Sequence, residues 1–307
     1  MRIAAMAAGA VGGYFGARMA AAGHDVFFIA RGANLEAMKK NGLKIESVHG
    51  DLHLPKPNAT DDPGSVGPVD VVLFAVKLWD TEDAAKLMKP MVGANTRVIT
   101  VQNGVDSVER LSTILPPDCV NGGAAYIATV IGSPGVIKHT SHFAKLRYGR
   151  LDRKPDAVLQ AFTDAGKAAK LDIDVSPDIN VEIWEKFIFL TAMSGATASL
   201  RSPIGAIRSD PELRPFYRAL MQEAYDVGRA KGVGLAADFV EGRMKFLDTI
   251  EPGMKASMAH DLERGNRIEL DWLSGKVRAL GRALNIPTPA SDTVYTVLKL
   301  HRMGGHA

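Results

Sequence analysis

The chain begins with the stretch MRIAAMAAGAVGGYFGARMAAA, residues 1–22. Its segment Arg2–Met6 has the apolar composition of a short buried strand, and Val11–Ala22 has that of an apolar helix. Between them, Ala7-Ala8-Gly9-Ala10-Val11-Gly12 matches the G-x-G-x-x-G dinucleotide pattern except for Ala7 at the first glycine. This order of strand, glycine-rich loop and helix predicts the first unit of a Rossmann-type fold.

Short apolar runs alternate with helical patterns through the first half of the chain. The predicted strands are Arg2–Met6, Asp25–Ala30, Val69–Ala75, Arg97–Thr100 and Cys119–Thr129. The predicted helices are Val11–Ala22, Asn34–Asn41, Thr81–Met91 and Ser107–Leu115. Leu43–Pro55 instead predicts an inserted hairpin with its turn at Gly50-Asp51, and Val136–Tyr148 predicts antiparallel strands at the sheet edge. The alternation predicts an α/β fold, with a mostly parallel sheet covered by helices on both faces.

Long helical patterns dominate the chain from about Pro177 onward. They cover Val181–Leu200, Pro211–Lys231, Ala236–Leu247, Ser257–Arg264, Ile268–Leu284 and Asp292–Arg302. A length of 307 residues suits two domains of about 150 residues each. We therefore predict a Rossmann-type domain at residues 1–176 and a second, all-helical C-terminal domain at residues 177–307.

The overall charge and the cysteine content exclude several classes of protein. The 37 Lys and Arg residues nearly balance the 34 Asp and Glu residues, so nucleic acid is not an expected partner. Cys119 is the only cysteine, so it forms no internal disulfide, which is typical of the reducing cytoplasm. The uncharged stretch Ile3–Ala17 is interrupted by glycines and is followed by Arg18, which argues against a signal peptide or a membrane span. We expect a soluble cytoplasmic protein with no membrane partner.

The glycine-rich loop predicts a binding site for a dinucleotide. Gly9 would let the backbone approach the pyrophosphate, and Gly12 would let the helix pack closely on the sheet. The free N–H groups at the helix start would face the phosphates. The predicted cofactor-binding residues of this loop are Ala7, Ala8, Gly9, Ala10, Val11 and Gly12. Because Ala7 adds a methyl group to a tight turn, we expect a shifted loop or a more weakly held cofactor.

The end of the second predicted strand selects between the two nicotinamide dinucleotides. NAD-binding sites carry an acidic residue there, which binds the ribose 2′-hydroxyl. This chain reads Phe28-Ile29-Ala30-Arg31-Gly32, with Arg31 at the tip and no carboxylate in the segment. A guanidinium suits the 2′-phosphate of NADP(H), so the sequence favours NADPH. The alternative is a solvated surface arginine with no role in binding.

Lys186 lies within a predicted helix, Val181–Leu200, that is apolar nearly all round. The segment Phe187–Met193 carries no charge, so this helix is expected to be buried. A lysine is rarely buried without a reason, and a positioned ammonium group can stabilise and protonate the oxygen of a ketone under reduction. The alternatives are a surface pair with Glu182 and a lysine whose ammonium reaches solvent from the helix start.

Several separated motifs together resemble the ketopantoate reductase (2-dehydropantoate 2-reductase) family over nearly the whole chain. The shared motifs are the loop with Gly9 and Gly12, Arg31, Val76-Lys77, Gln102-Asn103-Gly104, Trp184-Glu185-Lys186, Ser257-Met258 and Arg267-Ile268-Glu269-Leu270-Asp271. The resemblance implies NADPH-dependent reduction of a 2-oxo acid to a 2-hydroxy acid, between a Rossmann domain and a helical domain. It also implies a place in pantothenate biosynthesis.

The resemblance further implies roles for individual residues. Lys186 would be the general acid, and Glu269 would orient the lysine and bind the substrate hydroxyl. Ser257 would help to hold the substrate carboxylate. Asn103 and Lys77 match family positions that contact the nicotinamide ribose and the substrate.

Three positions depart from the family pattern on the substrate side. Leu190, Ser194 and Met254 stand where the family usually presents asparagines. A buried hydroxyl without a partner costs about 1–3 kcal/mol, so the hydroxyl of ketopantoate would be poorly served. The predicted substrate-binding residues are Asn103, Ser257, Ser194 and Leu190. We expect 2-dehydropantoate or a close analogue as the substrate, and the three departures leave open another, more apolar 2-oxo acid or ketone.

Two other functions stay open from the sequence. A related two-domain oxidoreductase acting on a more apolar ketone or an imine would suit the lost asparagines. A non-catalytic NADPH-binding sensor would suit the altered loop, but such a protein has no need of Lys186 and Glu269. No metal site is expected, because His139 and His142 lack a third ligand at a suitable spacing. We expect a monomer or a homodimer.

Overall fold

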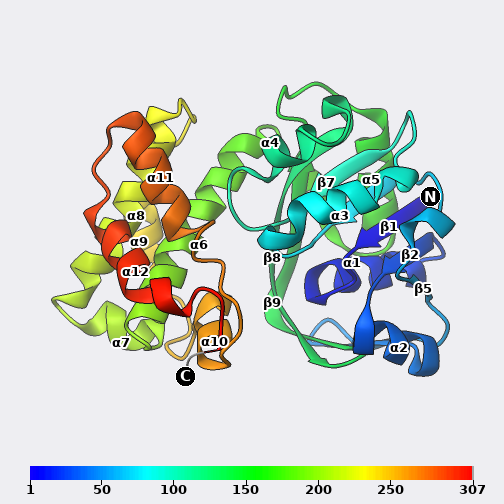
Figure 1. Cartoon of the computed structure of the whole chain (residues 1–307), viewed down its shortest axis with the longest axis horizontal. Helices are drawn as coiled ribbons and strands as arrows, with labels where there is room; N and C mark the ends of the chain where they lie inside the picture. The colour runs from blue at the N-terminus through cyan, green and yellow to red at the C-terminus, as the bar shows by residue number, and fades with distance from the viewer. Residues whose placement is uncertain (306–307) are drawn as a thin grey trace. The chain divides into compact units, whose positions relative to one another are not determined.

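The computed structural model describes residues 1–305 and divides into two compact units (Figure 1). The first unit contains Met1–Gln102 and Asp106–Glu182, and the second contains Asn103–Val105 and the chain from Ile183 onward. The domain boundary expected between residues 176 and 177 stays a prediction.

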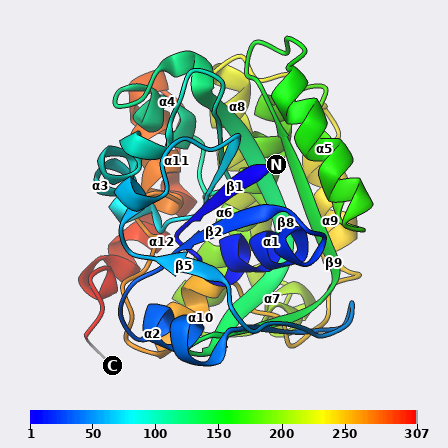
Figure 2. The same ribbon diagram turned by 90° about the vertical axis from the view of Figure 1, so that its right-hand side faces the viewer.

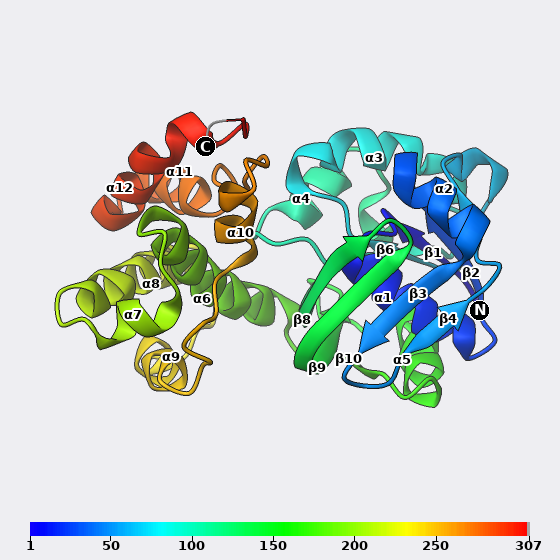
Figure 3. The same ribbon diagram turned by 90° about the horizontal axis from the view of Figure 1, so that it is seen from below.

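A ten-stranded sheet forms the centre of the first unit. Its strands are β1 (Arg2–Met6), β2 (Asp25–Ile29), β3 (Leu43–Ser47), β4 (Leu52–Leu54), β5 (Asn58–Thr60), β6 (Val71–Phe74), β7 (Arg97–Thr100), β8 (Val120–Ser133), β9 (Val136–Gly149) and β10 (Asp172–Val175). Their order is β4-β3-β9-β8-β7-β6-β1-β2-β5, with β10 paired to β9. Figure 3 shows β3 and β4 beside the long strands β8 and β9. Only the β3–β4 and β8–β9 pairs of this sheet are antiparallel, so the predicted α/β class with a mostly parallel sheet is confirmed.

The helices of the first unit connect the strands (Figure 2). They are α1 (Ala10–Ala21), α2 (Gly32–Asn41), α3 (Thr81–Leu87), α4 (Ser107–Ser112) and α5 (Ala157–Ala168). Short 3-10 turns are η1 (Pro63–Ser65), η2 (Leu78–Asp80), η3 (Lys89–Met91) and η4 (Pro117–Cys119). Their buried side chains cover the sheet in two clusters. Along β1, Ile3 and Ala5 belong to one cluster, whereas Ala4 and Met6 belong to the other, as expected for a strand buried on both faces.

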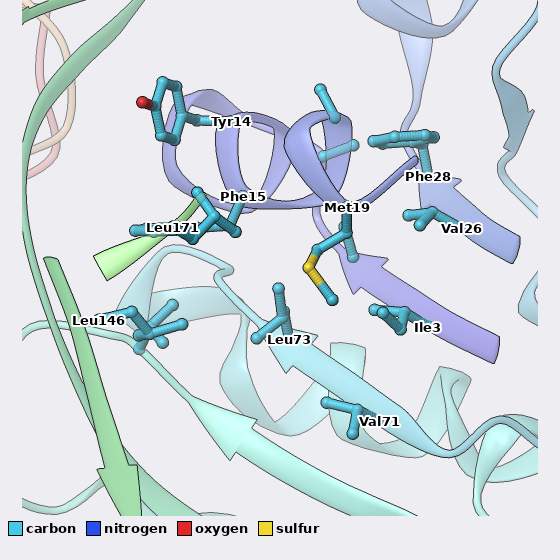
Figure 4. Close-up of a cluster of buried hydrophobic side chains, with 14 of the residues drawn as sticks. Ile3, Tyr14, Phe15, Met19, Val26, Phe28, Val71, Leu73, Leu146 and Leu171 are labelled. Atoms are coloured by element: carbon cyan, nitrogen blue, oxygen red, sulfur yellow. The ribbon is translucent and has the colours of Figure 1, made fainter. Parts of the chain in front are cut away.

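Helix α1 is held to the sheet by the larger of these clusters. Phe15 and Met19 are buried together with Ile3, Val26 and Leu73 (Figure 4). Fully burying a large apolar side chain contributes about 1.5–3 kcal/mol. This packing fixes the start of α1 at the carboxyl end of β1.

The described part of the second unit is helical, as predicted. Helix α6 (Ile179–Ser199) has residues in both units, and the others are α7 (Ile204–Ser209), α8 (Leu213–Ala230), α9 (Phe239–Leu247), α10 (Ser257–Glu263), α11 (Ser274–Leu284), α12 (Pro289–Leu298) and the turn η5 (Lys299–His301). Helix α8 contacts α7, α9, α11 and α12. Its Glu223 is buried and accepts the backbone N–H groups of Ala290 and Ser291 at the start of α12. From residue 1 to residue 305, no helix is both long and apolar enough to cross a membrane.

The helix predicted at Ile268–Leu284 is shorter in the structure, where α11 begins only at Ser274. The preceding residues form turns, in which the Glu269 carbonyl accepts the N–H groups of Trp272 and Leu273. The apolar spacing that suggested a helix arises because Leu270 and Leu273, three positions apart, are buried from a turn. Glu269 therefore lies outside any helix.

Other differences also have identifiable causes. Strand β9, which covers the predicted Val136–Tyr148, pairs with β8 on one side and with β3 and β10 on the other, so it is not at the sheet edge. The helix predicted at Thr81–Met91 is interrupted before Pro90, which cannot continue a helix without loss of a hydrogen bond. The sequence interpretation missed β5, α5, β10 and α7. A signal for α5 was present, because Asp156 caps it by accepting the N–H groups of Val158 and Leu159.

Candidate active site

The glycine-rich loop follows β1 and is fixed by backbone hydrogen bonds. The Ala8 N–H donates to the Ile29 carbonyl at 2.7 Å, and the Asn34 side-chain amide donates to the Ala8 carbonyl at 3.1 Å. Ala7 has φ of 64°, in the left-handed region that favours glycine. The structure therefore places alanine at the turn position where the dinucleotide pattern usually has glycine.

Two glycines of this loop have different surroundings. A Cβ atom added to Gly9 would meet nothing within 4 Å, so the backbone there faces open space. A Cβ atom on Gly12 would lie 2.8 Å from the Ala7 carbonyl oxygen and 3.1 Å from the Ala75 Cβ. Helix α1 has no side-chain cap at Gly9, and the first N–H groups of a helix have no partner within it. The loop thus offers an open backbone and unpaired donors, a combination that fits a phosphate group.

Arg31 and Lys77 lie near this edge of the sheet. Arg31 follows β2 and directly precedes α2, and its guanidinium donates to the Asp80 carboxylate at 2.7 Å. Its side chain is 82 % exposed. Lys77 follows β6 and directly precedes η2, and its Nζ lies 5.5 Å from the centre of the Trp79 ring. The segment Phe28–Gly32 contains no Asp or Glu, but the Asp80 carboxylate, from the segment after β6, lies beside Arg31 in the folded chain.

Gln102 is a residue that the sequence interpretation left without a role. It is buried after β7, and its side-chain amide donates to the Val76 carbonyl at 3.1 Å and to the Thr81 hydroxyl at 2.8 Å. Its oxygen accepts the Thr100 hydroxyl at 3.1 Å. Gln102 therefore links the end of β7 to the segment that carries Lys77. The presence of Gln102 in the motif Gln102-Asn103-Gly104 was the sequence feature that could have indicated this structural role.

Lys186 lies on α6 in the second unit and is half-buried. Burial lowers the pKa of Lys186 to about 8, against the raising effect of the nearby Glu269 carboxylate. The alternative of a surface pair with Glu182 is not what the structure shows, because the Glu182 carboxylate lies 3.7 Å from the Lys145 ammonium. From Phe187 to Ala198 the helix is mostly buried, as the apolar sequence predicts.

Glu269 and Asn103 form a polar pair within the same unit. Glu269 is 7 % exposed, and its carboxylate accepts a hydrogen bond from the Asn103 amide at 3.2 Å. Together with Lys186, they bring an ammonium, a carboxylate and an amide into one region from three separate segments. Such a set can hold a ketone oxygen and a hydroxyl group and can transfer a proton.

The other predicted substrate-binding residues, Ser194, Leu190 and Ser257, make fewer contacts with the Lys186 and Glu269 region. Ser194 is completely buried on α6, and its hydroxyl has no hydrogen-bond partner among the described residues. Leu190 is half-buried one turn from Lys186. Ser257 is exposed at the first position of α10, beside Ala256, whose N–H donates to the Thr197 hydroxyl of α6 at 3.3 Å. Within residues 1–305, no hydrogen bond links Ser257 to Lys186 or Glu269.

Met254 is 39 % exposed and precedes α10. His139 is buried, with its Nδ1 2.8 Å from the Ser47 hydroxyl and its Nε2 3.1 Å from the Phe143 carbonyl. In the described part of the chain, no group of three or more His, Cys, Asp or Glu side chains is placed to hold a metal ion.

Comparison with known proteins identifies the family. The model for the ketopantoate reductase PanE/ApbA family matches residues 3–153, and the model for the C-terminal part of the same family matches residues 178–302. These matches cover most of both units. The chain belongs to the ketopantoate reductase family, which confirms the resemblance inferred from the separated motifs.

Individual relatives match over nearly the full length. The 2-dehydropantoate 2-reductase of Mesorhizobium japonicum is 31 % identical, with 97 % of each chain covered. The "uncharacterized oxidoreductase YkpB" of Bacillus subtilis is 29 % identical, over 98 % of this chain and 99 % of that protein. A crystal structure of a PanE/ApbA family ketopantoate reductase from Ralstonia eutropha has a TM-score of 0.90 and 32 % identity, with 98 % of each chain covered.

Proposed function

We propose that this protein catalyses the NADPH-dependent reduction of a 2-oxo acid, 2-dehydropantoate or a close analogue, to the 2-hydroxy acid. The observation that carries the proposal is the half-buried Lys186, whose lowered pKa and neighbouring Glu269 suit a proton donor working near neutral pH. Membership of the ketopantoate reductase family supports the same reaction type. We also propose a cytoplasmic location, a monomer or a homodimer, and a place in pantothenate biosynthesis.

The glycine-rich loop would hold the cofactor. The backbone of Ala7–Gly12 and the start of α1 would face the pyrophosphate, and Gly9 leaves room for it. Arg31 would bind the adenosine 2′-phosphate, while Lys77 and Asn103 would contact the nicotinamide ribose. When bound, a reduced nicotinamide would supply a hydride, that is a hydrogen with its two bonding electrons, which forms the new C–H bond at the carbonyl carbon.

Lys186 would supply the proton that completes the reduction. As the C=O double bond accepts the electron pair at carbon, negative charge develops on oxygen. The Lys186 ammonium would stabilise that charge and pass one proton from Nζ to the oxygen, which becomes the hydroxyl of the product. Lys186 is then a neutral amine and regains its proton from water. A pKa of about 8 makes both steps feasible near neutral pH.

Glu269, Asn103, Ser257 and the α6 positions would hold the substrate. The Glu269 carboxylate would keep Lys186 charged and accept a hydrogen bond from a substrate hydroxyl, with its own orientation fixed by Asn103. Ser257 would bind the substrate carboxylate at the start of α10. The buried hydroxyl of Ser194 lacks a partner, so a polar substrate atom would satisfy it.

A second candidate, reduction of a more apolar ketone or imine, rests on Leu190. Its side chain occupies the turn of α6 next to Lys186 and offers no hydrogen bond. The test is oxidation of NADPH by the purified protein with a panel of 2-oxo acids that includes 2-dehydropantoate, together with apolar ketones and imines. Activity confined to the apolar compounds would replace the first proposal by the second.

The Lys186→Ala variant separates an enzyme from a cofactor-binding sensor. We expect kcat to fall at least about 100-fold, the usual contribution of a positioned acid, with little change in NADPH affinity. The matched control is Lys145→Ala, which removes a lysine that pairs with Glu182 in the first unit. Near-normal turnover of Lys186→Ala would remove this lysine from the mechanism. Binding of NADPH by the wild type without reduction of any compound would favour the sensor.

A further inference from the structure

An ion pair lies where the segments on both sides of the glycine-rich loop come together. Strand β1 is hydrogen-bonded to β2 and to β6, and Met6 at its end lies opposite Ile29 and Phe74. The segments that follow β2 and β6 therefore flank the loop that follows β1. Arg31 belongs to the first segment and Asp80 to the second, and their side chains meet at 2.7 Å. The pair joins the two segments that border the loop.

Asp80 is the more firmly placed member of this pair. It ends η2, in which the Leu78 carbonyl accepts the Thr81 hydroxyl at 2.9 Å and the Arg110 guanidinium at 2.7 Å. Arg110 is itself held by two hydrogen bonds to the Glu82 carboxylate, at 2.7 and 2.8 Å. The Asp80 side chain is 36 % exposed, against 82 % for Arg31. The Arg31 guanidinium therefore lies against a carboxylate whose own segment is held in place.

We propose that Asp80 is a specificity-determining residue that opposes Arg31 and reduces the preference for a 2′-phosphate over a 2′-hydroxyl on the adenosine ribose. This inference rests on the proposed function, in which Arg31 recognises the cofactor. The Asp80 carboxylate accepts a hydrogen bond from one terminal nitrogen of the guanidinium that a phosphate would need, and its negative charge opposes the positive charge there. It also repels a phosphate that carries a charge of about −1.5 to −2. Towards a ribose with a free 2′-hydroxyl, the same carboxylate is a hydrogen-bond acceptor.

The opposite role for Asp80 would be to hold Arg31 ready for the phosphate. Exposure argues against that role, because an exposed ion pair contributes at most about 1 kcal/mol and gives little ordering. The 2′-phosphate is repelled by the Asp80 carboxylate whether or not the Arg31–Asp80 ion pair stays formed. Competition is therefore the larger effect, and removal of the carboxylate charge is expected to increase NADPH affinity.

Calorimetric titration of the full-length protein with NADPH and with NADH tests this inference. For Asp80→Asn we expect NADPH to bind about five- to tenfold more tightly, as removal of a competing ion pair and a repulsive charge predicts. NADH affinity should be unchanged or weaker by about twofold, since one acceptor is lost. The matched control is Asp83→Asn on α3, a carboxylate that is 91 % exposed and 3.7 Å from Lys86. It removes the same charge from the neighbouring helix and should change both affinities by less than about twofold.

Titration with adenosine 2′,5′-bisphosphate and with AMP measures the affinity for the 2′-phosphate without the nicotinamide half of the cofactor. Asp80→Asn should tighten the bisphosphate and leave AMP nearly unchanged, and the gain should be smaller in the Arg31→Ala background. If Asp80→Asn leaves the ratio of NADPH to NADH affinity within about twofold of wild type, or weakens NADPH, the inference is overturned. If the wild-type protein binds neither dinucleotide, the proposed function itself fails, which is a different result from an unchanged ratio.

Discussion

The pH dependence of the reduction is the most direct test of Lys186. Only the protonated lysine can donate a proton, and its pKa is lowered by burial to about 8. The value of kcat/KM should therefore be constant well below pH 8 and fall tenfold for each pH unit well above it. Two units above the pKa, about 1 % of the plateau should remain. An ordinary exposed lysine would stay protonated about two units higher.

The Glu269→Gln variant tests the cause of this pKa. The Glu269 carboxylate raises the pKa of Lys186, so its neutralisation should move the midpoint to lower pH. An opposite charge at close range is worth about one pKa unit or more. A shift of about one unit would reduce the protonated fraction at pH 8 from about one half to about one tenth. The fivefold loss of kcat/KM should nearly disappear about two pH units below pH 8, where both enzymes are almost fully protonated. Any lower kcat/KM of the variant that remains there reports the contribution of Glu269 to substrate binding.

The assay is the initial rate of NADPH oxidation with the best substrate of the panel, from about two units below to two units above pH 8. The control is Glu185→Gln, which removes the carboxylate beside Lys186 in sequence that lies 3.5 Å from Arg243. We expect its midpoint to match the wild type. A wild-type profile that stays flat above pH 8 would refute the role of Lys186 as the acid. A midpoint that stays in place or rises in Glu269→Gln would refute the electrostatic coupling between the two residues.

Three further substitutions test the remaining assignments. Arg31→Ala should weaken NADPH much more than NADH in parallel titrations, because only NADPH carries the 2′-phosphate, and equal losses would contradict the assignment. Ala7→Gly should relieve the strain at φ 64°, raising the free energy of unfolding in urea by up to about 1 kcal/mol and tightening NADPH by about two- to fivefold; weaker binding would mean that the loop has adapted to alanine. Leu190→Asn should improve 2-dehydropantoate relative to apolar 2-oxo acids by returning a hydrogen-bond partner one turn from Lys186, and an unchanged preference in kcat/KM would show that this face of α6 does not contact the substrate.

Features that depend on neighbouring residues could be predicted from the sequence. The stretch from Arg2 to Ala22 contains a complete strand, turn and helix, and the structure has β1 and α1 within one residue of the predicted bounds. The positive φ of Ala7 and the close packing at Gly12 follow from the same local pattern. The uncharged run after Lys186 likewise predicted a buried helix, because a helix without a polar face has no side to present to water.

Features that depend on distant residues could not be predicted in this way. Asn103 and Glu269 are 166 residues apart, and Arg31 and Asp80 are 49 residues apart. No local pattern records either pair, because sheet order and helix packing bring them together. The turns before α11 show a different limit. Leu270, Leu273 and Val277 are buried at helical spacing, yet the Glu269 carbonyl accepts its hydrogen bonds in a turn and the helix begins only at Ser274.

The two distant pairs bear on function in different ways. The Asn103–Glu269 bond holds a carboxylate near Lys186, where its charge supports the protonated state that the reduction needs. The Arg31–Asp80 pair places a carboxylate on the cation that would recognise the cofactor, where its charge opposes the ligand. Glu269 is buried, at 7 % exposure of the residue, whereas the Asp80 side chain is 36 % exposed, so water screens the Asp80 charge more strongly. Neutralisation of Glu269 should therefore lower the rate of the reaction in a pH-dependent way, whereas neutralisation of Asp80 should change the cofactor preference and leave the pH dependence of the reduction in place.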